Sequence, residues 1–548
     1  MESRLKKVLA VYVLLVVLKV VLSFFVVAPS VFSDEYVYVK LARSFFFGQE
    51  FSVHGVPVNQ QMPLYPVVLS WTYLFGDMTV VYAAMKILNA LLLSSVVFPV
   101  FLVAGDFVEG RKALFVAALV GFLPAVFVTS FYVMSENLFY PLVAFWVFFV
   151  YRAFRDNDPL YFKLAGLFLG LAFLTRFIGL VLVPVAFLLW MFRVRKVAFS
   201  KVFVSYAIAL LVVLPWVVRN VLLFGWSFGS IAGASGVGAA KELAATGSLL
   251  VLVNWIFLYG AYVVLASGVL FGMYALLWRT VKVRDFRLFG WIVSLAVLFF
   301  ALAAANHSNP TLTSGFGRPI GRYVDAVLPM FVTLGFVAFE RAKVKRVVLK
   351  RLVMVVGVFL LFAAQLAVAS LFPFNNASLT LVGVAKYGLD VFFVGRFVGD
   401  AVVYSSFVVL AAVLGLSPLL FLRRARWQPY LVMAFVVVSS VLAFAVTYEN
   451  ARRWHGSEQM RLGMLLNELD PDVSRIVFDE RDCVERLSVA GEGICELTRR
   501  STIAGFWLND EIVVGDVYAE DYDLVVSKHH LGFERVNDLK GEVFAYRP

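Results

Sequence analysis

Long apolar segments follow one another along this chain as far as residue 448, and they constrain its fold more than any other feature. Most of them approach the roughly 20 residues that a helix needs to cross the hydrocarbon core of a bilayer. Hydrophobic residues make up 62% of the 548 residues and charged residues only 15%, with a mean hydropathy of +0.88, whereas a soluble domain is near a quarter charged. The sequence therefore predicts a multi-spanning α-helical membrane protein.

Segmentation of the apolar runs gives about thirteen expected spans. The fifth and sixth are short and meet at Thr175-Arg176, which is the least defined of the boundaries. The expected spans are 8–28, 80–104, 112–131, 133–151, 160–175, 177–193, 200–223, 249–277, 287–305, 323–340, 348–372, 400–422 and 429–448.

Clusters of lysine and arginine recur between these spans, and with thirteen spans all of them fall on one face of the membrane. Basic loops stay in the cytoplasm, so we expect a cytoplasmic N-terminus and an extracytoplasmic C-terminal tail. The net charge of +12 is then a topology signal and does not indicate nucleic-acid binding. We expect the first segment to be a retained helix and not a signal peptide. The clusters are Arg4/Lys6/Lys7, Arg111/Lys112, Arg152/Arg155/Lys163, Arg193/Arg195/Lys196/Lys201, Arg279/Lys282/Arg284/Arg287, Arg341/Lys343/Lys345/Arg346/Lys350/Arg351 and Arg423/Arg424/Arg426.

The composition changes after Thr447, where the last hundred residues hold 20 acidic and 12 basic side chains. An amphipathic stretch near Ser457–Leu469 precedes apolar runs of strand length. We therefore expect a membrane domain over residues 1–448, with a first external loop at 29–79, and a small extracytoplasmic α/β domain over residues 449–548. The strand-like runs are Ile476-Val477-Phe478, Ile512-Val513-Val514, Leu524-Val525-Val526 and Val543-Phe544-Ala545.

Two further features of the expected external regions concern a disulfide bond and N-glycosylation. Cys483 and Cys495 are the only cysteines, and a disulfide between them suits an oxidising compartment and a small domain; two separate thiols are the alternative. Asn376-Ala377-Ser378 is an N-glycosylation sequon on the expected outer side.

Ionisable residues gather on that outer side, although such groups are costly at membrane depth and usually face a cavity or a partner. Each has a simpler interpretation: Asp34-Glu35 as a solvated loop pair, Glu136 as an internal brace for Arg176, and His307 as a loop residue. Lipid headgroups are the simpler ligand for Arg318 and Arg322. The full set is Asp34, Glu35, Glu136, Arg176, Arg219-Asn220, His307, Arg318, Arg322 and Tyr323.

Several other site types are not indicated by the sequence. The chain lacks a phosphate-cradling glycine loop followed by lysine, so no nucleotide site is predicted. His, Cys and carboxylate residues show no metal-ligand spacing, and the 55 phenylalanines fit helix packing and lipid contact. No cofactor is predicted, and a divalent cation that screens a phosphate at the external carboxylates is left open.

External carboxylates beside external arginines suit one reaction, the transfer of a sugar from a lipid phosphate to a hydroxyl. The leaving phosphate needs cations to absorb its charge, and the acceptor hydroxyl needs a base. Inverting transfer therefore requires one well-placed carboxylate and an arginine or lysine, unlike glycoside hydrolysis with its two carboxyl groups. A membrane-bound donor also requires the site to lie at the membrane surface.

The order of these motifs resembles the GT-C superfamily, in the branch with protein O-mannosyltransferases and the aminoarabinose transferases of lipid A. The resemblance covers most of the membrane region and is best over residues 30–190 and 315–335. The matching signals are Asp34-Glu35 with Tyr36 and Tyr38, Ala42 with Gly48, Pro63-Leu64-Tyr65-Pro66, Ser135-Glu136 with Pro141, Gly166, Gly170 and Thr175-Arg176, and Gly321-Arg322-Tyr323 with Pro329.

The resemblance implies roles for individual residues. Asp34 corresponds to the general base, Glu35 supports it or binds the acceptor, and Glu136 is the second acidic site residue. Arg322 and Tyr323 correspond to contacts with the donor phosphate and sugar, and Arg176 is the weaker candidate for the phosphate. Arg318 is a further candidate for substrate binding because of its place on the outer side.

The chain departs from the aminoarabinose transferases at two cationic positions. They carry a lysine before the loop prolines, where this chain has Gln61-Met62, and an arginine where it has Val37. The departures imply that other cations bind the phosphate.

We therefore expect a membrane glycosyltransferase that uses a polyprenyl-phosphate sugar as its donor and a glycan, lipid or protein as its acceptor. A lipid-linked glycan transporter or polymerase is the alternative. A transporter is expected to show paired half-repeats and broken helices in matching positions, and neither is found in the sequence. The sequence does not name the sugar or the acceptor.

Overall fold

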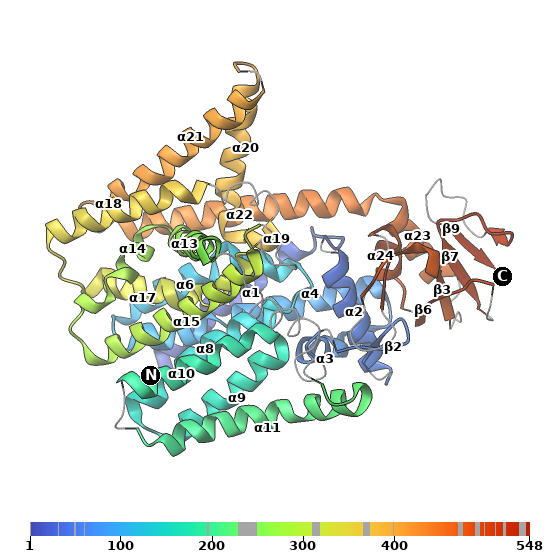
Figure 1. Ribbon diagram of the computed structural model, residues 1–548, viewed down its shortest axis with the longest axis horizontal. Helices are drawn as coiled ribbons and strands as arrows, with labels where there is room; N and C mark the ends of the chain where they lie inside the picture. Colours follow the sequence, from blue (N-terminus) through green and yellow to red (C-terminus); the bar gives the residue numbers. More distant parts are fainter. Residues whose placement is uncertain are drawn as a thin grey trace.

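Helices dominate the computed structural model (Figure 1). It describes residues 2–30, 32–48, 51–59, 61–193, 197–227, 249–309, 318–364, 373–397, 399–469, 475–487, 494–497, 499–509, 511–518, 522–535 and 544–547.

Eight helical segments of the described chain are long and apolar enough to cross a membrane, and a ninth is a bent pair with an angle of 69° at its break. The predicted fold class is therefore confirmed, although this test does not establish thirteen spans. The eight segments are Met78–Gly105, Glu136–Asp156 (α8), Phe199–Phe224 (α11), Leu249–Ala266 (α13), Arg284–Ser308 (α15), Phe374–Val394, Asp400–Phe421 and Gln428–His455 (α22), and the bent pair joins Gly110–Gly121 (α6) to Pro124–Phe131.

The other expected spans coincide with helices that are shorter or carry more charge. The first helix, α1, holds Lys6, Lys7 and Lys19 within 22 residues. These helices are α1 (Glu2–Ser23), α9 (Pro159–Thr175), η3 (Phe177–Leu182) with α10 (Val183–Arg193), α17 (Leu328–Arg341) and α18 (Arg346–Phe362). Further elements of this region are α4 (Met78–Ser94), α5 (Val97–Gly105), α7 (Pro124–Phe127), η2 (Val128–Phe131), α14 (Leu270–Leu276), η4 (Trp278–Thr280), α16 (Arg322–Asp325), α19 (Pro373–Asn376), η6 (Ala377–Leu379), α20 (Thr380–Val394), α21 (Asp400–Leu416) and η7 (Ser417–Phe421).

The apolar segment that contains α20 was not expected from the sequence. Its charges interrupt the hydropathy pattern, but Lys386 donates to Asp390 one helical turn later, at 2.6 Å. This pair offsets the two charges within the helix. In Figure 1 α20 rises at a steep angle to α22, and α21 returns toward α18, with which it packs.

Polar contacts distinguish the two ends of the helical bundle. Helix α8 begins at Glu136 at one end and finishes at Asp156 at the other. At the Asp156 end, Lys112 pairs with Glu340 at 2.6 Å and Arg155 pairs with Asp106. We call the end that carries Lys112 and Arg155 the basic end. The opposite end carries Glu136 and the C-terminal domain (Figure 1).

The segment between the first two long helical regions is folded, although the sequence suggested a loop over 29–79. It contains α2 (Phe32–Phe46), a hairpin of β1 (Ser52–Val53) and β2 (Val56–Pro57), α3 (Leu64–Ser70) and η1 (Trp71–Phe75). Tyr73 donates to the Val39 carbonyl at 2.9 Å, which ties η1 to α2. Helix α2 also packs against α3.

The C-terminal region forms a small α/β domain, as predicted. Its five-stranded sheet has the order β6-β3-β7-β9-β8, with β3 parallel to β6 and β7, and β9 antiparallel to its neighbours. All four predicted apolar runs supply strands of this sheet. The elements are α23 (Glu458–Leu469), β3 (Arg475–Asp479), η8 (Glu480–Asp482), β4 (Cys483–Leu487), β5 (Ile494–Leu497), α24 (Arg499–Phe506), β6 (Glu511–Gly515), β7 (Leu524–Ser527), β8 (Glu534–Arg535) and β9 (Phe544–Arg547).

A disulfide joins the hairpin at the edge of this domain. Cys483 on β4 is disulfide-bonded, and Cys495, the only other cysteine of the chain, lies on β5, which pairs with β4 in antiparallel register. The structure therefore favours the bonded alternative.

The C-terminal domain rests directly on α2. Lys40 donates to the Leu508 carbonyl at 2.6 Å, and Arg43 donates to the Asn509 carbonyl at 2.5 Å. Asn509 in turn donates to the Gly76 carbonyl at 2.8 Å. The helix that carries the acidic pair is thus held between the bundle and the C-terminal domain.

Candidate functional site

Asp34 and Glu35 occupy the first turn of α2, where acidic side chains interact favourably with the helix dipole. Adjacent helical residues point about 100° apart, so the two carboxylates face different surroundings. Asp34 keeps 33% of its side chain exposed, whereas Glu35 is completely buried.

Glu35 fixes the fold around α2. One carboxylate oxygen accepts a hydrogen bond from the Ser30 amide and the other from the Val133 amide, both at 2.9 Å. Of the two roles that the resemblance implied, this burial fits support of Asp34 and leaves no open face for an acceptor. It ties the start of α2 to the turn that precedes α8.

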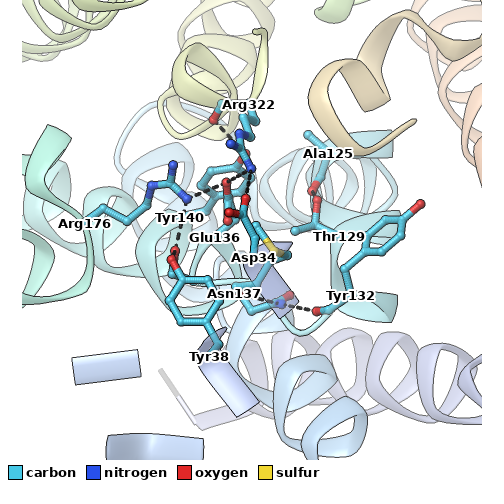
Figure 2. A network of polar contacts seen from close by, with 12 residues as sticks. Asp34, Tyr38, Ala125, Thr129, Tyr132, Glu136, Asn137, Tyr140, Arg176 and Arg322 are labelled. Carbon is cyan, nitrogen blue, oxygen red and sulfur yellow. Dashed lines mark hydrogen bonds and ion pairs between the residues drawn. The ribbon is translucent and has the colours of Figure 1, made fainter. Parts of the chain in front are cut away.

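Four charged side chains converge where α2, α8, α9 and α16 meet, as Figure 2 shows. Arg322 donates to Asp34 at 3.2 Å and lies 3.6 Å from Glu136. Arg176 lies 2.5 Å from the same Glu136 oxygen. The structure thus brings together two of the predicted acids, Asp34 and Glu136, and two of the predicted arginines. The predicted Glu136–Arg176 brace forms within this larger network.

Exposure differs sharply within the network. The side chains of Glu136, Arg176 and Arg322 are 2%, 14% and 16% exposed, compared with 33% for Asp34. Burial lowers the pKa of Arg322, but the Glu136 and Asp34 carboxylates more than offset this and leave its pKa above the ordinary value. Asp34 is therefore the charged group of this network that an incoming molecule reaches most easily.

Aromatic and hydroxyl groups complete the surroundings of Arg176. It donates to the Ser135 hydroxyl at 3.0 Å, and the Tyr38 hydroxyl is 2.8 Å from the same oxygen. The guanidinium lies 5.6 Å from the ring centre of Tyr323, within range of a cation–π contact. Tyr323 is partly exposed and packs against His307, with 5.3 Å between ring centres.

A buried network behind Arg322 was not predicted from the sequence. Tyr140 donates to the Arg322 carbonyl at 2.8 Å. Asp325 is buried and accepts hydrogen bonds from Tyr262 at 2.9 Å and from Ser378 at 3.1 Å. The signal in the sequence was an acidic residue three positions after Arg322, but its partners lie more than fifty residues away.

The residues just before Arg322 are fixed by a second buried group. Asn376 accepts from the Gly321 amide at 2.9 Å and donates to the Pro319 carbonyl at 3.0 Å. A Cβ at Gly321 would lie 2.1 Å from the Tyr262 ring, so this approach requires glycine. Asn376 is fully buried, and the predicted sequon therefore serves the fold and is closed to glycosylation in this structure.

The remaining predicted residues lie around this centre. Arg318 is exposed, four positions before Arg322. Arg219 donates to the Val58 carbonyl at 2.9 Å and to Asn220 at 2.8 Å, and so holds the β1–β2 hairpin against α11.

The groups of this site can bind an anion and can accept a proton from a hydroxyl group. The Arg322 Nε is buried without a hydrogen-bond partner in the described part of the chain, so the guanidinium retains a donor. Two arginines supply positive charge, and the exposed carboxylate of Asp34 can accept a proton. Within the same described residues, no group of three or more His, Cys, Asp or Glu side chains is placed to hold a metal ion.

Comparison with known proteins gives a family match and a structural match. Residues 62–218 match the family model described as dolichyl-phosphate-mannose-protein mannosyltransferase. ArnT from Cupriavidus metallidurans bound to undecaprenyl phosphate matches with a TM-score of 0.60 at 13% identity, over 98% of this chain and 97% of that one. The chain has the GT-C glycosyltransferase fold. The superfamily predicted from the motifs is thus confirmed, and so is the glycosyltransferase class, which the family match also supports.

A second structure gives the same result for this GT-C chain. ArnT from the same organism in the apo state has a TM-score of 0.56 and 15% identity, over 97% of both chains. No curated protein sequence matches the chain. At such low sequence identity the structural match establishes the fold but not the substrates.

Proposed function

We propose that this chain transfers a sugar from a polyprenyl phosphate to a hydroxyl group of an acceptor, with inversion at the sugar carbon. The observation that carries the proposal is the contact of Arg322 with both Asp34 and Glu136, beside Arg176. The family match to a dolichyl-phosphate-mannose enzyme and the likeness to an ArnT bound to undecaprenyl phosphate support a lipid phosphate as the leaving group.

In the proposed reaction Asp34 is the general base. The acceptor oxygen bonds to the sugar carbon while its proton passes to Asp34, and the bond between that carbon and the phosphate oxygen breaks. A positioned base contributes about 10²–10⁴-fold to such a step. Asp34 suits this role because it is the most exposed of the four network groups.

The arginines take the charge of the departing polyprenyl phosphate in this proposal. Arg322 is the principal contact, because its Nε donor is uncommitted, and Arg176 and Arg318 are secondary candidates. Tyr323 lies against Arg176 and is assigned to the sugar. Glu136 neutralises the two buried arginines until the phosphate arrives, and Glu35 holds α2 in place.

We also propose that this end of the bundle faces away from the cytoplasm. The proposal is supported by the basic loops at the opposite end, because lysine and arginine loops remain cytoplasmic. The acceptor is then a glycan, a lipid or a protein outside the cytoplasmic membrane. A protease cut within residues 449–548 in sealed right-side-out vesicles tests this orientation, and protection of the C-terminal domain there would contradict it.

The reaction is tested by incubating the purified protein with a panel of prenyl-phosphate hexoses and pentoses and measuring release of prenyl phosphate. We expect release with one class of donor. Arg322→Ala should weaken donor affinity more than acceptor affinity, whereas Arg396→Ala, an exposed arginine after α20, should change neither. Equal losses of donor and acceptor affinity in Arg322→Ala would refute its assignment, and failure to bind any of these lipids would refute the lipid-phosphate donor.

A further inference from the structure

A hollow of about 460 Å³ lies at the basic end of the bundle, away from the charged network of the proposed active site. It is lined by the residues that follow α17, the start of α18, Tyr274 of α14 and the residues that follow η7. Its volume is in the range of small-molecule sites, roughly 300–1,000 Å³. The side chains on which the argument rests are four cations and two apolar or aromatic groups: Lys343, Arg346, Arg423, Arg424, Tyr274 and Leu349.

The charge around this hollow is uncompensated, whereas some other cations at the basic end are paired. Lys112 and Arg152 are paired with carboxylates at 2.6 and 2.7 Å. By contrast, Lys343, Arg346 and Arg423 have no ion-pair partner within the described ranges of the chain, and no residue that lines the hollow is acidic. Like charges that converge without a counter-charge repel one another, so an anion bound among them would stabilise this end.

One of the four cations is held rigidly in place. Arg424 donates to the Glu340 carbonyl at 3.0 Å and to the Ala342 carbonyl at 3.5 Å, and its guanidinium lies 4.7 Å from the Phe339 ring centre. These contacts use backbone oxygens and an aromatic face, so the positive charge of Arg424 is oriented without being neutralised. A preorganised guanidinium matches the geometry of a phosphate.

Exposed aromatic residues mark the level of the hollow relative to the bilayer. Trp427 is 54% exposed and Tyr430 is 68% exposed, both at the start of α22 and within seven residues of Arg423. Tryptophan and tyrosine favour the level of the lipid headgroups. The hollow therefore opens where phosphates of the membrane lie.

We propose that this hollow binds the phosphate of an anionic phospholipid, with Arg424, Arg423, Arg346 and Lys343 around the headgroup. Tyr274 and Leu349, both buried at the inner wall, lie beside the first part of the acyl chains. Basic pockets between membrane helices are suited to such headgroups. The site is separate from the proposed donor site, and its occupant stabilises the basic end without taking part in sugar transfer.

Native mass spectrometry of the purified full-length protein in detergent tests this proposal. The protein is titrated with phosphatidylglycerol, with zwitterionic phosphatidylcholine and, in a third arm, with inorganic phosphate as competitor. We expect tighter binding of phosphatidylglycerol than of phosphatidylcholine, with inorganic phosphate unable to displace it at equal concentration. Equal binding of the two lipids, or displacement by equimolar phosphate, would overturn the assignment to an anionic lipid.

Two triple variants with the same change in charge distinguish binding in this hollow from general electrostatic attraction of the anionic lipid to the basic end. Lys343→Gln/Arg346→Gln/Arg423→Gln should weaken phosphatidylglycerol binding by on the order of 100-fold, since each cation near a membrane surface contributes about fivefold. The matched control replaces three exposed cations of the same end that lie outside the hollow, Arg111, Lys163 and Lys282, by glutamine, and binding should persist. Equal losses in the two triples would overturn the proposal.

A single variant guards against failure of the first triple to fold. Arg423→Gln changes one exposed, unpaired side chain, and its binding of phosphatidylglycerol should fall about fivefold. Unchanged binding in this variant, with its thermal unfolding equal to that of the wild type, would contradict a role for Arg423 in the site.

Discussion

At the scale of single residues, the proposed reaction depends on how two arginines are kept positive in a mostly apolar bundle. A buried ion pair loses hydration on both sides, so it is stable only with good geometry and further polar contacts. Arg176 has the Ser135 hydroxyl and the Tyr323 ring as well as Glu136. Arg322 has two carboxylates and a backbone held by Tyr140.

The coupling of Glu136 and Arg176 gives a prediction about stability. Glu136→Gln leaves buried positive charge without its partner, and we expect the free energy of unfolding to fall by about 3–5 kcal/mol. Adding Arg176→Gln to this variant removes the uncompensated charge and should recover much of that loss. Thermal and denaturant unfolding of the two single variants and the double variant measures the coupling. Additive losses would show that the two side chains act independently.

Sequence reasoning reached the charged residues of the site but not those that hold them. Asp34, Glu136, Arg176 and Arg322 stood out because ionisable groups are scarce in apolar segments, and the structure brings all four together. The roles of Asp325 and Asn376 depend on partners distant in the chain. Glu35 turned out to face the interior because the acidic pair lies on a helix, not in a loop.

At the scale of elements, close packing of helices fixes where these charges lie. Arg176 follows directly after α9, so its position depends on how α9 packs against α11. A Cβ at Gly166 would lie 2.2 Å from the Ser205 carbonyl oxygen, and one at Gly170 would lie 2.8 Å from Val212. Small residues four apart allow two membrane helices to approach closely, which gives the glycines of the family pattern a physical reason.

A larger residue at Gly166 should therefore disturb the site from a distance. Gly166→Val forces α9 away from α11, and we expect a loss of stability of about 1–3 kcal/mol together with slower sugar transfer. Gly388→Val is the matched control, because this helical glycine of α20 has no neighbour within 4 Å of a built Cβ. Unfolding temperature and transfer rate should both change in the first variant only. A similar loss in both variants would mean that the close approach of α11 to Gly166 is not responsible.

Element prediction succeeded for the short apolar strands and failed for one apolar helix that carries two charges. The apolar runs from Ile476, Ile512 and Leu524 read as strands because they are short, bounded and rich in branched residues. The segment that contains α20 was missed although its length and composition suffice for a membrane span, and Lys386 and Asp390 pair within one helical turn of it.

At the scale of the whole molecule, the C-terminal domain and the membrane bundle share α2. Phe506 and Trp507 pack edge-on against Tyr82 of α4, with ring centres 5.4 and 5.6 Å apart. Lys40 of α2 donates to the backbone of the same region. This contact could not be predicted from the sequence, because it joins residues more than four hundred positions apart. The domain therefore contacts the helix that carries the proposed base.

Crowding this contact should slow the reaction without touching the site. A Cβ at Gly505 would lie 3.1 Å from the Tyr36 hydroxyl, two residues from Asp34 in the chain, so Gly505→Leu should push α24 away from α2. Because a misplacement of about 1 Å costs on the order of 10²-fold in rate, we expect a clear loss of transfer. Hydrogen exchange over residues 34–46 should rise in parallel.

The control for this variant lies in the same domain. Gly532→Leu meets nothing within 4 Å of a built Cβ, and it should leave both transfer and exchange as in the wild type. Wild-type transfer by Gly505→Leu would show that the docked domain does not position α2.

The central claim, that Asp34 is the base of a sugar transfer, is tested most directly by Asp34→Asn in the purified protein with its lipid donor. We predict that turnover falls about 10²–10⁴-fold, while donor binding and the unfolding temperature stay near the wild-type values. Asp400→Asn, at an exposed acid on α21, should transfer sugar normally. Near-normal turnover by Asp34→Asn would contradict the account.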